Sequence, residues 1–173
     1  LFSYGATNDY RLAIRSAAGA LWAIIGATTV KISDYQSGQG NLLGSWLHLA
    51  IVKDEKTASA WLNGRKVADI PVVNWPAATA KAKRLTLGGA QDFGGGLKYP
   101  MKGRLAGFHA STKALFVRSF GPQAQTKATH KGDLIALPLD DGKGTSLSDK
   151  SGNLHEASNS GGNWLSNSGP YCT

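Results

Sequence analysis

The stretch that decides the fold of this chain lies between residues 46 and 109. It contains WLHLAIV (46–52), AWLNGRKV (60–67), LTLGG (85–89) and MKGRLAGFH (101–109). Each segment is short, carries apolar or aromatic side chains, and has a Trp, a Gly or an Asn-Gly pair at its edge. Short apolar runs bounded by turn residues predict β-strands joined by tight turns. We therefore expect these segments to form consecutive strands of an all-β domain.

The side-chain order within this stretch predicts which faces are buried. Three alternate positions of the strand expected at 46–53 carry large apolar side chains and share one face: Leu47, Leu49 and Ile51. The pair Asn63-Gly64 predicts a tight hairpin turn, because both central residues of a type I′ turn need a positive φ. Trp46 and Trp61 fall inside expected strands, so we expect both to pack in the core.

The rest of the chain continues the same pattern. Further strands are predicted at 1–5, 10–15, 21–26, 28–32 and 134–139; within 46–109 the last two strands are expected at 84–87 and 104–109. Loops are predicted at 37–44, 71–82 and 88–103. Residues 114–118 are predicted as a short helix or a last strand. Nothing in this order suggests alternating strands and helices.

Composition sets the broad class. The chain has 173 residues, of which 42% are hydrophobic and 22 are glycine, enough for one sizeable core of many short strands. No apolar run approaches the roughly 18 residues of a membrane span, so membrane insertion is not expected. The net charge is +8. The lone Cys172 has no cysteine partner within the chain, and its partner elsewhere stays open.

The ordered set of segments between residues 46 and 109 resembles the second half of a laminin-G-like or pentraxin domain. The resemblance implies an antiparallel two-sheet jelly-roll sandwich of the concanavalin A-like class. It also implies recognition of sugars, glycoproteins or neighbouring proteins rather than catalysis, and an extracellular or cell-surface location.

The tail LPLDDGKGTSLSDKSGNLH (137–155) resembles the opening of such a domain. We therefore divide the chain into a sandwich at 1–119 that lacks its usual first strands, a connector at 120–132, and an opening strand with turns at 133–173. The order is rotated relative to the family. The segment is cut from a tandem array, is circularly permuted, or completes a neighbouring copy by strand addition; we favour a longer multidomain protein.

The pentraxin likeness suggests calcium at two loops near the sheet. Asn8 and Asp9 resemble one ligand loop, and Gln91 and Asp92 resemble the other. Calcium binds 6–8 oxygens from carboxylates, amides and carbonyls. However, Ala90 stands where the family has a Glu, and Lys98 falls near another expected Glu. The alternative, that Asn8, Asp9 and Asp92 are ordinary turn residues, is the interpretation we favour.

A second calcium candidate is the turn from Asp149 to Asn153, whose oxygens suit a structural ion. The alternative is a turn capped by hydrogen bonds from Asp and Ser side chains to the backbone. We favour the capped turn. Calcium is the cofactor suggested by the loops at Asn8–Asp9 and Gln91–Asp92 and by the turn at Asp149–Asn153.

Basic and aromatic residues supply the candidate ligand contacts. Cations gather in the second half of the front region: Lys81, Lys83, Arg84, Lys98, Lys102, Arg104, Lys113 and Arg118. Among these we select Lys98, Lys102 and Arg104, and we add Trp75 and Trp164 because they lie in loops. The alternative for the two tryptophans, which we favour, is that they close the end of the sandwich. The resemblance implies sulfated glycans or acidic glycoproteins as partners; a solvated surface is an equal alternative. No nucleic-acid motif accompanies these charges.

Catalysis is not expected from this sequence. Glycosidases that retain configuration need two carboxyl groups about 5–5.5 Å apart, and the two glutamates, Glu55 and Glu156, lie at a turn and in the tail. We therefore expect a non-enzymatic extracellular module that binds glycans or glycoproteins. Other domains of the same chain or of neighbouring chains are expected as further partners. The alternative is a structural repeat module of a filament, coat or other large assembly.

Overall fold

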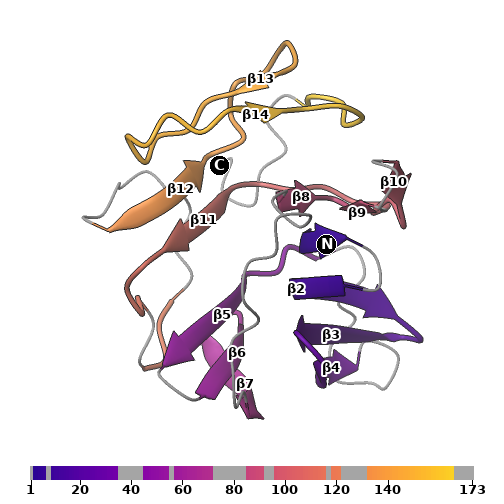
Figure 1. The fold of residues 1–173 in the computed structure, drawn as a ribbon, viewed down its shortest axis with the longest axis vertical. Helices are drawn as coiled ribbons and strands as arrows, with labels where there is room; N and C mark the ends of the chain where they lie inside the picture. Colours follow the sequence, from indigo (N-terminus) through magenta and orange to yellow (C-terminus); the bar gives the residue numbers. More distant parts are fainter. Residues whose placement is uncertain are drawn as a thin grey trace. The chain divides into compact units, whose positions relative to one another are not determined.

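The computed structural model describes residues 2–6, 9–34, 45–54, 57–71, 85–91, 96–115, 118–121 and 132–165. These residues form strands and turns, and none of them lies in a helix (Figure 1). The chain divides into two compact units. Unit 1 comprises Leu1–Gly103 and Arg118–Gly121, and unit 2 comprises Arg104–Val117 and Pro122–Thr173.

Unit 1 contains two sheets. Its strands are β1 (Phe2–Ala6), β2 (Asp9–Ala17), β3 (Ala20–Ile25), β4 (Thr28–Asp34), β5 (Leu49–Asp54), β6 (Thr57–Leu62), β7 (Arg65–Pro71), β8 (Leu85–Leu87), β9 (Ala90–Gln91) and β10 (Leu97–Lys98). The larger sheet has the order β10-β9-β1-β2-β3-β4, with β8 also paired to β1, and the smaller has the order β5-β6-β7. All pairs are antiparallel except the single bridge between β1 and β9.

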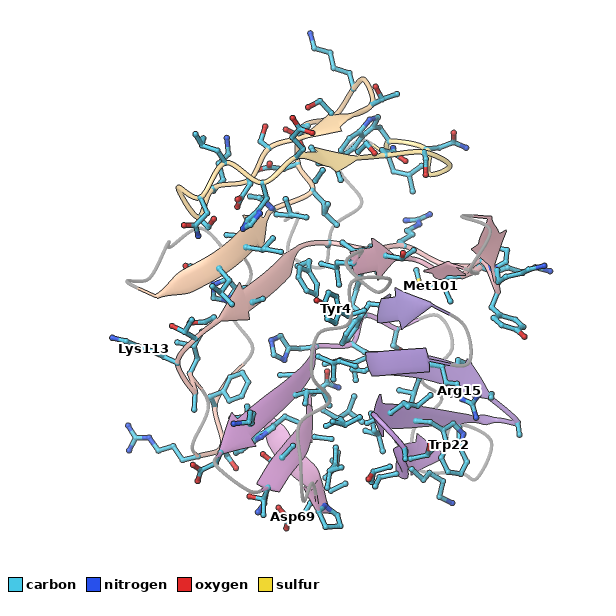
Figure 2. The ribbon with its side chains drawn as sticks, viewed as in Figure 1. Tyr4, Arg15, Trp22, Asp69, Met101 and Lys113 are labelled. Carbon is cyan, nitrogen blue, oxygen red and sulfur yellow. The ribbon has the colours of Figure 1, made fainter. Side chains whose placement is uncertain are left out.

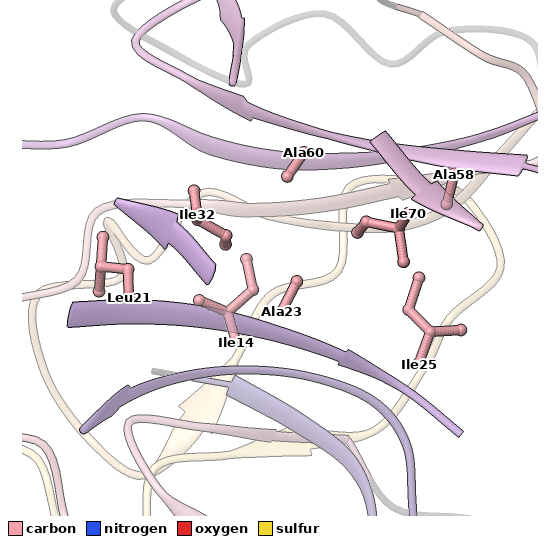
Figure 3. Packing of buried hydrophobic residues seen from close by; sticks show 8 residues of the cluster. All are labelled: Ile14, Leu21, Ala23, Ile25, Ile32, Ala58, Ala60 and Ile70. Carbon is pink, nitrogen blue, oxygen red and sulfur yellow. The ribbon is translucent and has the colours of Figure 1, made fainter. Parts of the chain in front are cut away.

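The core of unit 1 lies between these two sheets. The larger sheet contributes Ile14, Leu21, Ala23, Ile25 and Ile32, and the smaller sheet contributes Ala58, Ala60 and Ile70 (Figure 3). Leu47, Leu49 and Ile51 pack against this cluster, which confirms the face predicted for them. Alternation along each strand thus builds the expected two-layer all-β sandwich.

Glycine and asparagine set the hairpins of unit 1. Asn63 and Gly64 have φ values of 49° and 77°, which confirms the predicted type I′ signature between β6 and β7. Asn63 also joins the start of β5, because its backbone N–H donates to the carbonyl of His48 (2.8 Å) while its side-chain oxygen accepts from the backbone N–H of His48 (2.9 Å). Ala18 and Gly19 form a similar turn between β2 and β3.

Unit 2 is built from two pairs of strands. β11 (Phe108–Ser111) pairs with β12 (Asp133–Leu137), and β13 (Ser146–Leu147) pairs with β14 (Ala157–Ser158). Gly132 closes one end of the first pair, since its carbonyl accepts hydrogen bonds from the backbone N–H of Thr112 (2.9 Å) and from the hydroxyls of Ser111 and Thr112. A strand from residues 108–111 is therefore joined to one from residues 133–137.

Several predicted boundaries are wrong. The strand expected from Trp46 begins at Leu49, the one expected from Arg104 begins at Phe108, and the one expected to reach Leu139 ends at Leu137. The predicted loop at 88–103 contains the short strands β9 and β10. Residues 114–118 were predicted as a short helix or a last strand. Residues 114, 115 and 118 lie in neither, and residues 116 and 117 lie outside the described part.

Candidate functional site

One residue of each predicted calcium loop lies at the same end of the larger sheet. Ala6, the last residue of β1, is the partner of both Asp9 and Gln91, and Gln91 is in turn the partner of Leu97. The backbone register therefore places Asp9 and Gln91 in one row across neighbouring strands.

The ligand atoms of this corner are not among those described. Asn8 and Asp92 lie outside the described residues, and for Asp9 and Gln91 the structure describes only the backbone. Ala90 is buried, at 6% exposure, and its cross-strand partner is the exposed Lys98. A cation opposite the position where the family carries a Glu opposes cation binding. Calcium at this corner stays a prediction.

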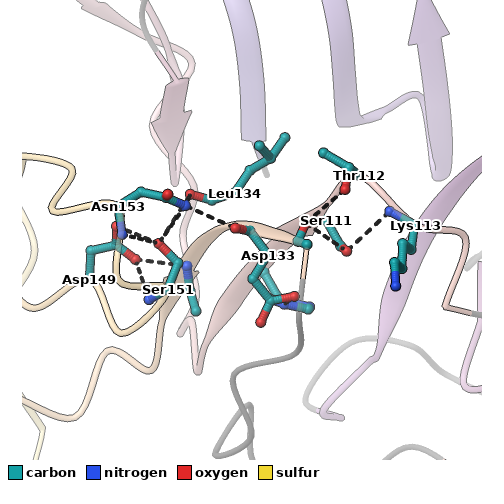
Figure 4. Close-up of polar contacts among 11 residues, drawn as sticks. Ser111, Thr112, Lys113, Asp133, Leu134, Asp149, Ser151 and Asn153 are labelled. Carbon is teal, nitrogen blue, oxygen red and sulfur yellow. Dashed lines mark hydrogen bonds and ion pairs between the residues drawn. The ribbon is translucent and has the colours of Figure 1, made fainter.

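The Asp149 turn is described in full, and its carboxylate makes four hydrogen bonds. One oxygen accepts from the backbone N–H groups of Ala136 (3.0 Å) and Ser151 (2.9 Å). The other accepts from the hydroxyl of Ser151 (2.8 Å) and the backbone N–H of His155 (3.1 Å) (Figure 4). This is the side-chain-to-backbone capping that the turn interpretation predicts.

These hydrogen bonds keep the Asp149 carboxylate ionised. Burial raises its pKa, but the hydrogen bonds from Ala136, Ser151 and His155 lower it by more, so the pKa lies well below its usual value. Both oxygens already serve as acceptors for N–H and O–H donors. Calcium at Asp149 and Asn153 stays a prediction, and a bound ion would have to compete with these donors.

The same turn covers one side of β12. The side-chain N–H₂ of Asn153 donates to the carbonyls of Asp133 and Leu134 (2.9 Å each), and the backbone N–H of Lys150 donates to the carbonyl of Ala136 (2.7 Å). With the bond from Ala136 to Asp149, these contacts bind β12 along the side that does not pair with β11. The turn at 149–153 thus takes the place of a neighbouring strand.

The predicted ligand residues fall into different parts of the chain. Lys98 and Lys102 are exposed in unit 1, and Arg104 is exposed in unit 2. Trp164 is half-buried, and its indole N–H donates to the carbonyl of Gly144 (2.7 Å), which anchors the ring within unit 2. Trp75 lies outside the described residues. Ligand binding by these five residues stays a prediction.

Two tryptophans expected in the core have different environments. Trp61 is 5% exposed, as predicted, and its ring packs against Phe120 (centroids 6.1 Å apart). Trp46 is 38% exposed and precedes β5, so the prediction for it is wrong. Phe120 also meets His48 edge-on at 5.3 Å. Burial lowers the pKa of His48, which favours the neutral ring.

Family comparison then decides what kind of sandwich this is. A family model described as the concanavalin A-like lectin/glucanases superfamily, of laminin G type, matches residues 1–118. The chain belongs to this laminin-G family. No curated protein and no solved structure matches the chain.

Membership in the laminin-G family has coarse functional consequences. Concanavalin A-like lectin and laminin-G domains are generally non-catalytic, and membership suggests a lectin-like or adhesion module with carbohydrate or protein partners. Laminin-G-like domains are typically extracellular. Among the described residues, no helix has the length and apolar character needed to cross a membrane.

The laminin-G match ends close to β11, and β12 to β14 follow it in the chain. Across the β11–β12 pair, Nε2 of His109 lies 2.8 Å from Oδ1 of Asp133, whose side chain is 1% exposed. A residue of the matched segment thus contacts a buried carboxylate of the tail. The domain boundaries at 119 and 132 stay predictions. Whether the arrangement is tandem, permuted or strand-swapped stays open as well.

One arrangement in the laminin-G segment was not predicted from the sequence. Arg15, Trp22 and Lys31 are direct cross-strand partners on β2, β3 and β4. Alternation around Ile14 already indicates that Arg15 points away from the core. The register that aligns the three residues could not be found from alternation alone, because it depends on how neighbouring strands pair.

Proposed function

We propose that this chain is a non-enzymatic extracellular recognition module that binds glycans or glycoproteins. The observation that carries the proposal is the laminin-G family match over residues 1–118, the segment that contains the whole two-sheet sandwich. The net charge of +8 supports an acidic partner, because positive surface charge attracts anionic glycans and speeds their association.

A glycan array tests this proposal directly. The whole chain is applied to arrayed sulfated, carboxylated and neutral glycans at physiological salt, once with calcium and once with a chelator. We expect selective binding to a subset of glycans. A blank array under both conditions would contradict the proposal, and self-association in sedimentation velocity would then favour the structural repeat module.

Calcium dependence is a separate part of the proposal. If the loops at Asn8–Asp9 and Gln91–Asp92 hold calcium, the ion stabilises the folded chain by mass action. The melting temperature of the wild type should then rise with calcium, and Asp92→Ala should abolish that rise. Equal melting temperatures in calcium and in chelator would remove calcium from the proposal and leave glycan binding to be judged by the array.

A further inference from the structure

The outer face of the larger sheet carries an aromatic side chain between two cations. Arg15 of β2 is the cross-strand partner of Trp22 of β3, and Trp22 is the partner of Lys31 of β4. Directly opposite residues on antiparallel strands project on the same face, with Cβ atoms about 4.5–5.5 Å apart. Figure 2 shows Arg15 and Trp22 close together on this sheet. The three side chains therefore form one row, here called the Arg15–Trp22–Lys31 row.

This row faces away from the core. The neighbours Ile14, Leu21 and Ile32 belong to the core cluster between the two sheets, and successive side chains on a strand alternate in direction. Arg15 and Lys31 are both exposed, whereas Trp22 is half-buried. Strand register thus places two exposed cations and a half-buried aromatic ring together on this face, next to the buried pair Ala13 and Ile24.

The indole of Trp22 is held in place by its own unit. Its Nε1–H donates to the carbonyl of Ala17 at 3.1 Å, at the end of β2 next to the turn into β3. A ligand that stacks on the ring therefore does not need to satisfy this donor, and the ring loses little freedom on binding. The pairing of β3 with β4 is irregular between Leu21 and Trp22, and such bulges redirect side chains at binding surfaces.

The chemistry of the row fits one class of ligand. An aromatic face offers an apolar platform to the C–H side of a pyranose ring. The guanidinium of Arg15 presents paired N–H donors that match a carboxylate or a sulfate, and Lys31 adds a second positive charge across the ring. A neutral sugar uses only the platform, whereas an anionic sugar uses all three residues.

We propose that the Arg15–Trp22–Lys31 row is a subsite for an anionic pyranose, carrying a sulfate or a carboxylate, within a longer glycan. This inference rests on the proposed glycan-binding function and names the ligand class and the residues that bind it. The row does not include any of the loop residues selected from the sequence. The proposed subsite therefore lies on strands, which hold binding residues more rigidly than loops do.

The test compares three oligosaccharides by isothermal titration calorimetry on the whole chain: a heparin-derived sulfated hexasaccharide, a galacturonic acid hexasaccharide and neutral cellohexaose. The variants are Arg15→Gln and Trp22→Ala. The matched control is Arg65→Gln, which removes the same charge from an exposed position of β7. Heparin carries sulfates and carboxylates, whereas galacturonate carries carboxylates alone. Binding of galacturonate would therefore show that a carboxylate suffices, and binding of heparin alone would show that the sulfate is needed.

We expect at least one anionic probe to bind the wild type more tightly than cellohexaose does. Arg15→Gln should weaken that binding about tenfold, the usual scale for loss of one well-placed contact, and Arg65→Gln should weaken it less than about twofold through long-range charge. Trp22→Ala should weaken all three probes. Because Trp22→Ala also removes a half-buried ring, its thermal unfolding is measured beside that of the wild type. If Trp22→Ala is unfolded, the comparison of Arg15→Gln with Arg65→Gln decides the test.

Three outcomes would overturn the inference. Equal losses in Arg15→Gln and Arg65→Gln would show diffuse charge attraction instead of a subsite. Unchanged binding in a folded Trp22→Ala would remove the platform. A positive glycan array combined with no preference for either anionic hexasaccharide would refute the anionic subsite while leaving the proposed function intact, whereas a blank array would refute both.

Discussion

The two compact units differ in what holds their strands together. Unit 1 has an apolar core between two sheets, in which Ile14, Ile25 and Ile70 are 1%, 2% and 0% exposed. Unit 2 has two two-stranded sheets, and a buried carboxylate, Asp133, accompanies its buried Ala136 and Leu137. Two-stranded ribbons are marginally stable by themselves, so unit 2 depends more on polar contacts at its turns.

The same chain therefore stabilises its strands in two ways, by apolar burial in unit 1 and by hydrogen bonds at turns in unit 2. In unit 1, alternation places large side chains between the layers, and burial of apolar surface stabilises the fold. In unit 2, the turn at 149–153 and the carbonyl of Gly132 satisfy backbone groups that a wider sheet would otherwise satisfy. Each substitution below should act mainly on one unit and so tests the comparison.

The largest effect is expected from Ile14→Ala in unit 1. Truncating a fully buried Ile loses its transfer free energy and leaves a cavity, which costs about 2–5 kcal/mol of unfolding free energy. Chemical denaturation measures the loss, and hydrogen exchange should show it first in the amides of β2 to β4. The matched control, Val67→Ala, shortens a side chain that is 41% exposed and should change stability by less than about 0.5 kcal/mol. Equal effects of the two variants would contradict an apolar core centred on Ile14.

The next effect is expected from Gly132→Ala in unit 2. Gly132 has φ of +106°, and a Cβ there would lie 2.9 Å from Oγ1 of Thr112. The strained backbone and the displaced hydroxyl should cost about 1–3 kcal/mol. Gly161→Ala is the control, because a Cβ there meets nothing within 4 Å. Hydrogen exchange at Thr112 and along β12 measures the loss; full protection in Gly132→Ala would mean that this corner does not secure the pair.

Asp149→Asn should have a smaller effect on the same unit. Asn keeps one carbonyl oxygen, but its N–H₂ group cannot accept the hydrogen bonds made to the other carboxylate oxygen, which come either from the N–H groups of Ala136 and Ser151 or from the hydroxyl of Ser151 and the N–H of His155. We expect a loss of about 1–2 kcal/mol, because these bonds are partly open to water. Faster amide exchange at Ala136 or at His155, whichever faces the N–H₂ group, measures it, and Asp140→Asn, at an exposed site, is the control.

Acid should reproduce the Asp149→Asn effect in the wild type. The pKa of Asp149 in the folded chain lies below its usual value of 3.8. Its contribution to stability is therefore complete above about pH 4 and declines as the pH falls below that value, because the unfolded chain takes up the proton first. Wild type and Asp149→Asn should converge in stability as the pH is lowered, and a constant difference between pH 7 and pH 2 would contradict this account.

The smallest effect is expected from His48 in unit 1. Burial lowers its pKa from 6.5 in the folded chain, so the unfolded chain binds a proton more readily. The contribution of His48 to stability is thus present above about pH 6.5 and is lost as the pH falls through its folded-state pKa. His48→Gln should flatten the decline in melting temperature between pH 7.5 and pH 5, and His155→Gln, at an exposed site, should not.

Local signals predicted much of unit 1. Alternation identified the face of Leu47, Leu49 and Ile51, and the Asn63-Gly64 pair identified a hairpin by its need for positive φ. Strand starts were less accurate, because Trp46 and His48 have strand-type composition but precede β5. Sequence pattern reports which conformations are favourable; the hydrogen bonds between Asn63 and His48 decide where pairing begins.

The candidate sites were predicted less completely. The sequence identified the Asp149 turn and both of its interpretations, and the structure describes the hydrogen bonds of the capped turn. It did not identify the Arg15–Trp22–Lys31 row, because the three residues come from separate strands. Nor could it show that Trp164 is anchored by Gly144, since that contact joins positions on either side of β13 and β14.

The sequence by itself determined that this is an all-β chain with strands of defined faces, because alternation and turn residues act over a few neighbouring positions, and the order of its segments resembles a laminin-G domain. Only the tertiary structure decided which strands lie side by side: β1 beside β9, β11 beside β12, and the register that aligns Arg15 with Trp22 and Lys31. Register depends on pairing between distant segments and on the packing of both sheets. A shift of one residue in the register of a strand would move all its side chains to the opposite face and would separate Arg15, Trp22 and Lys31.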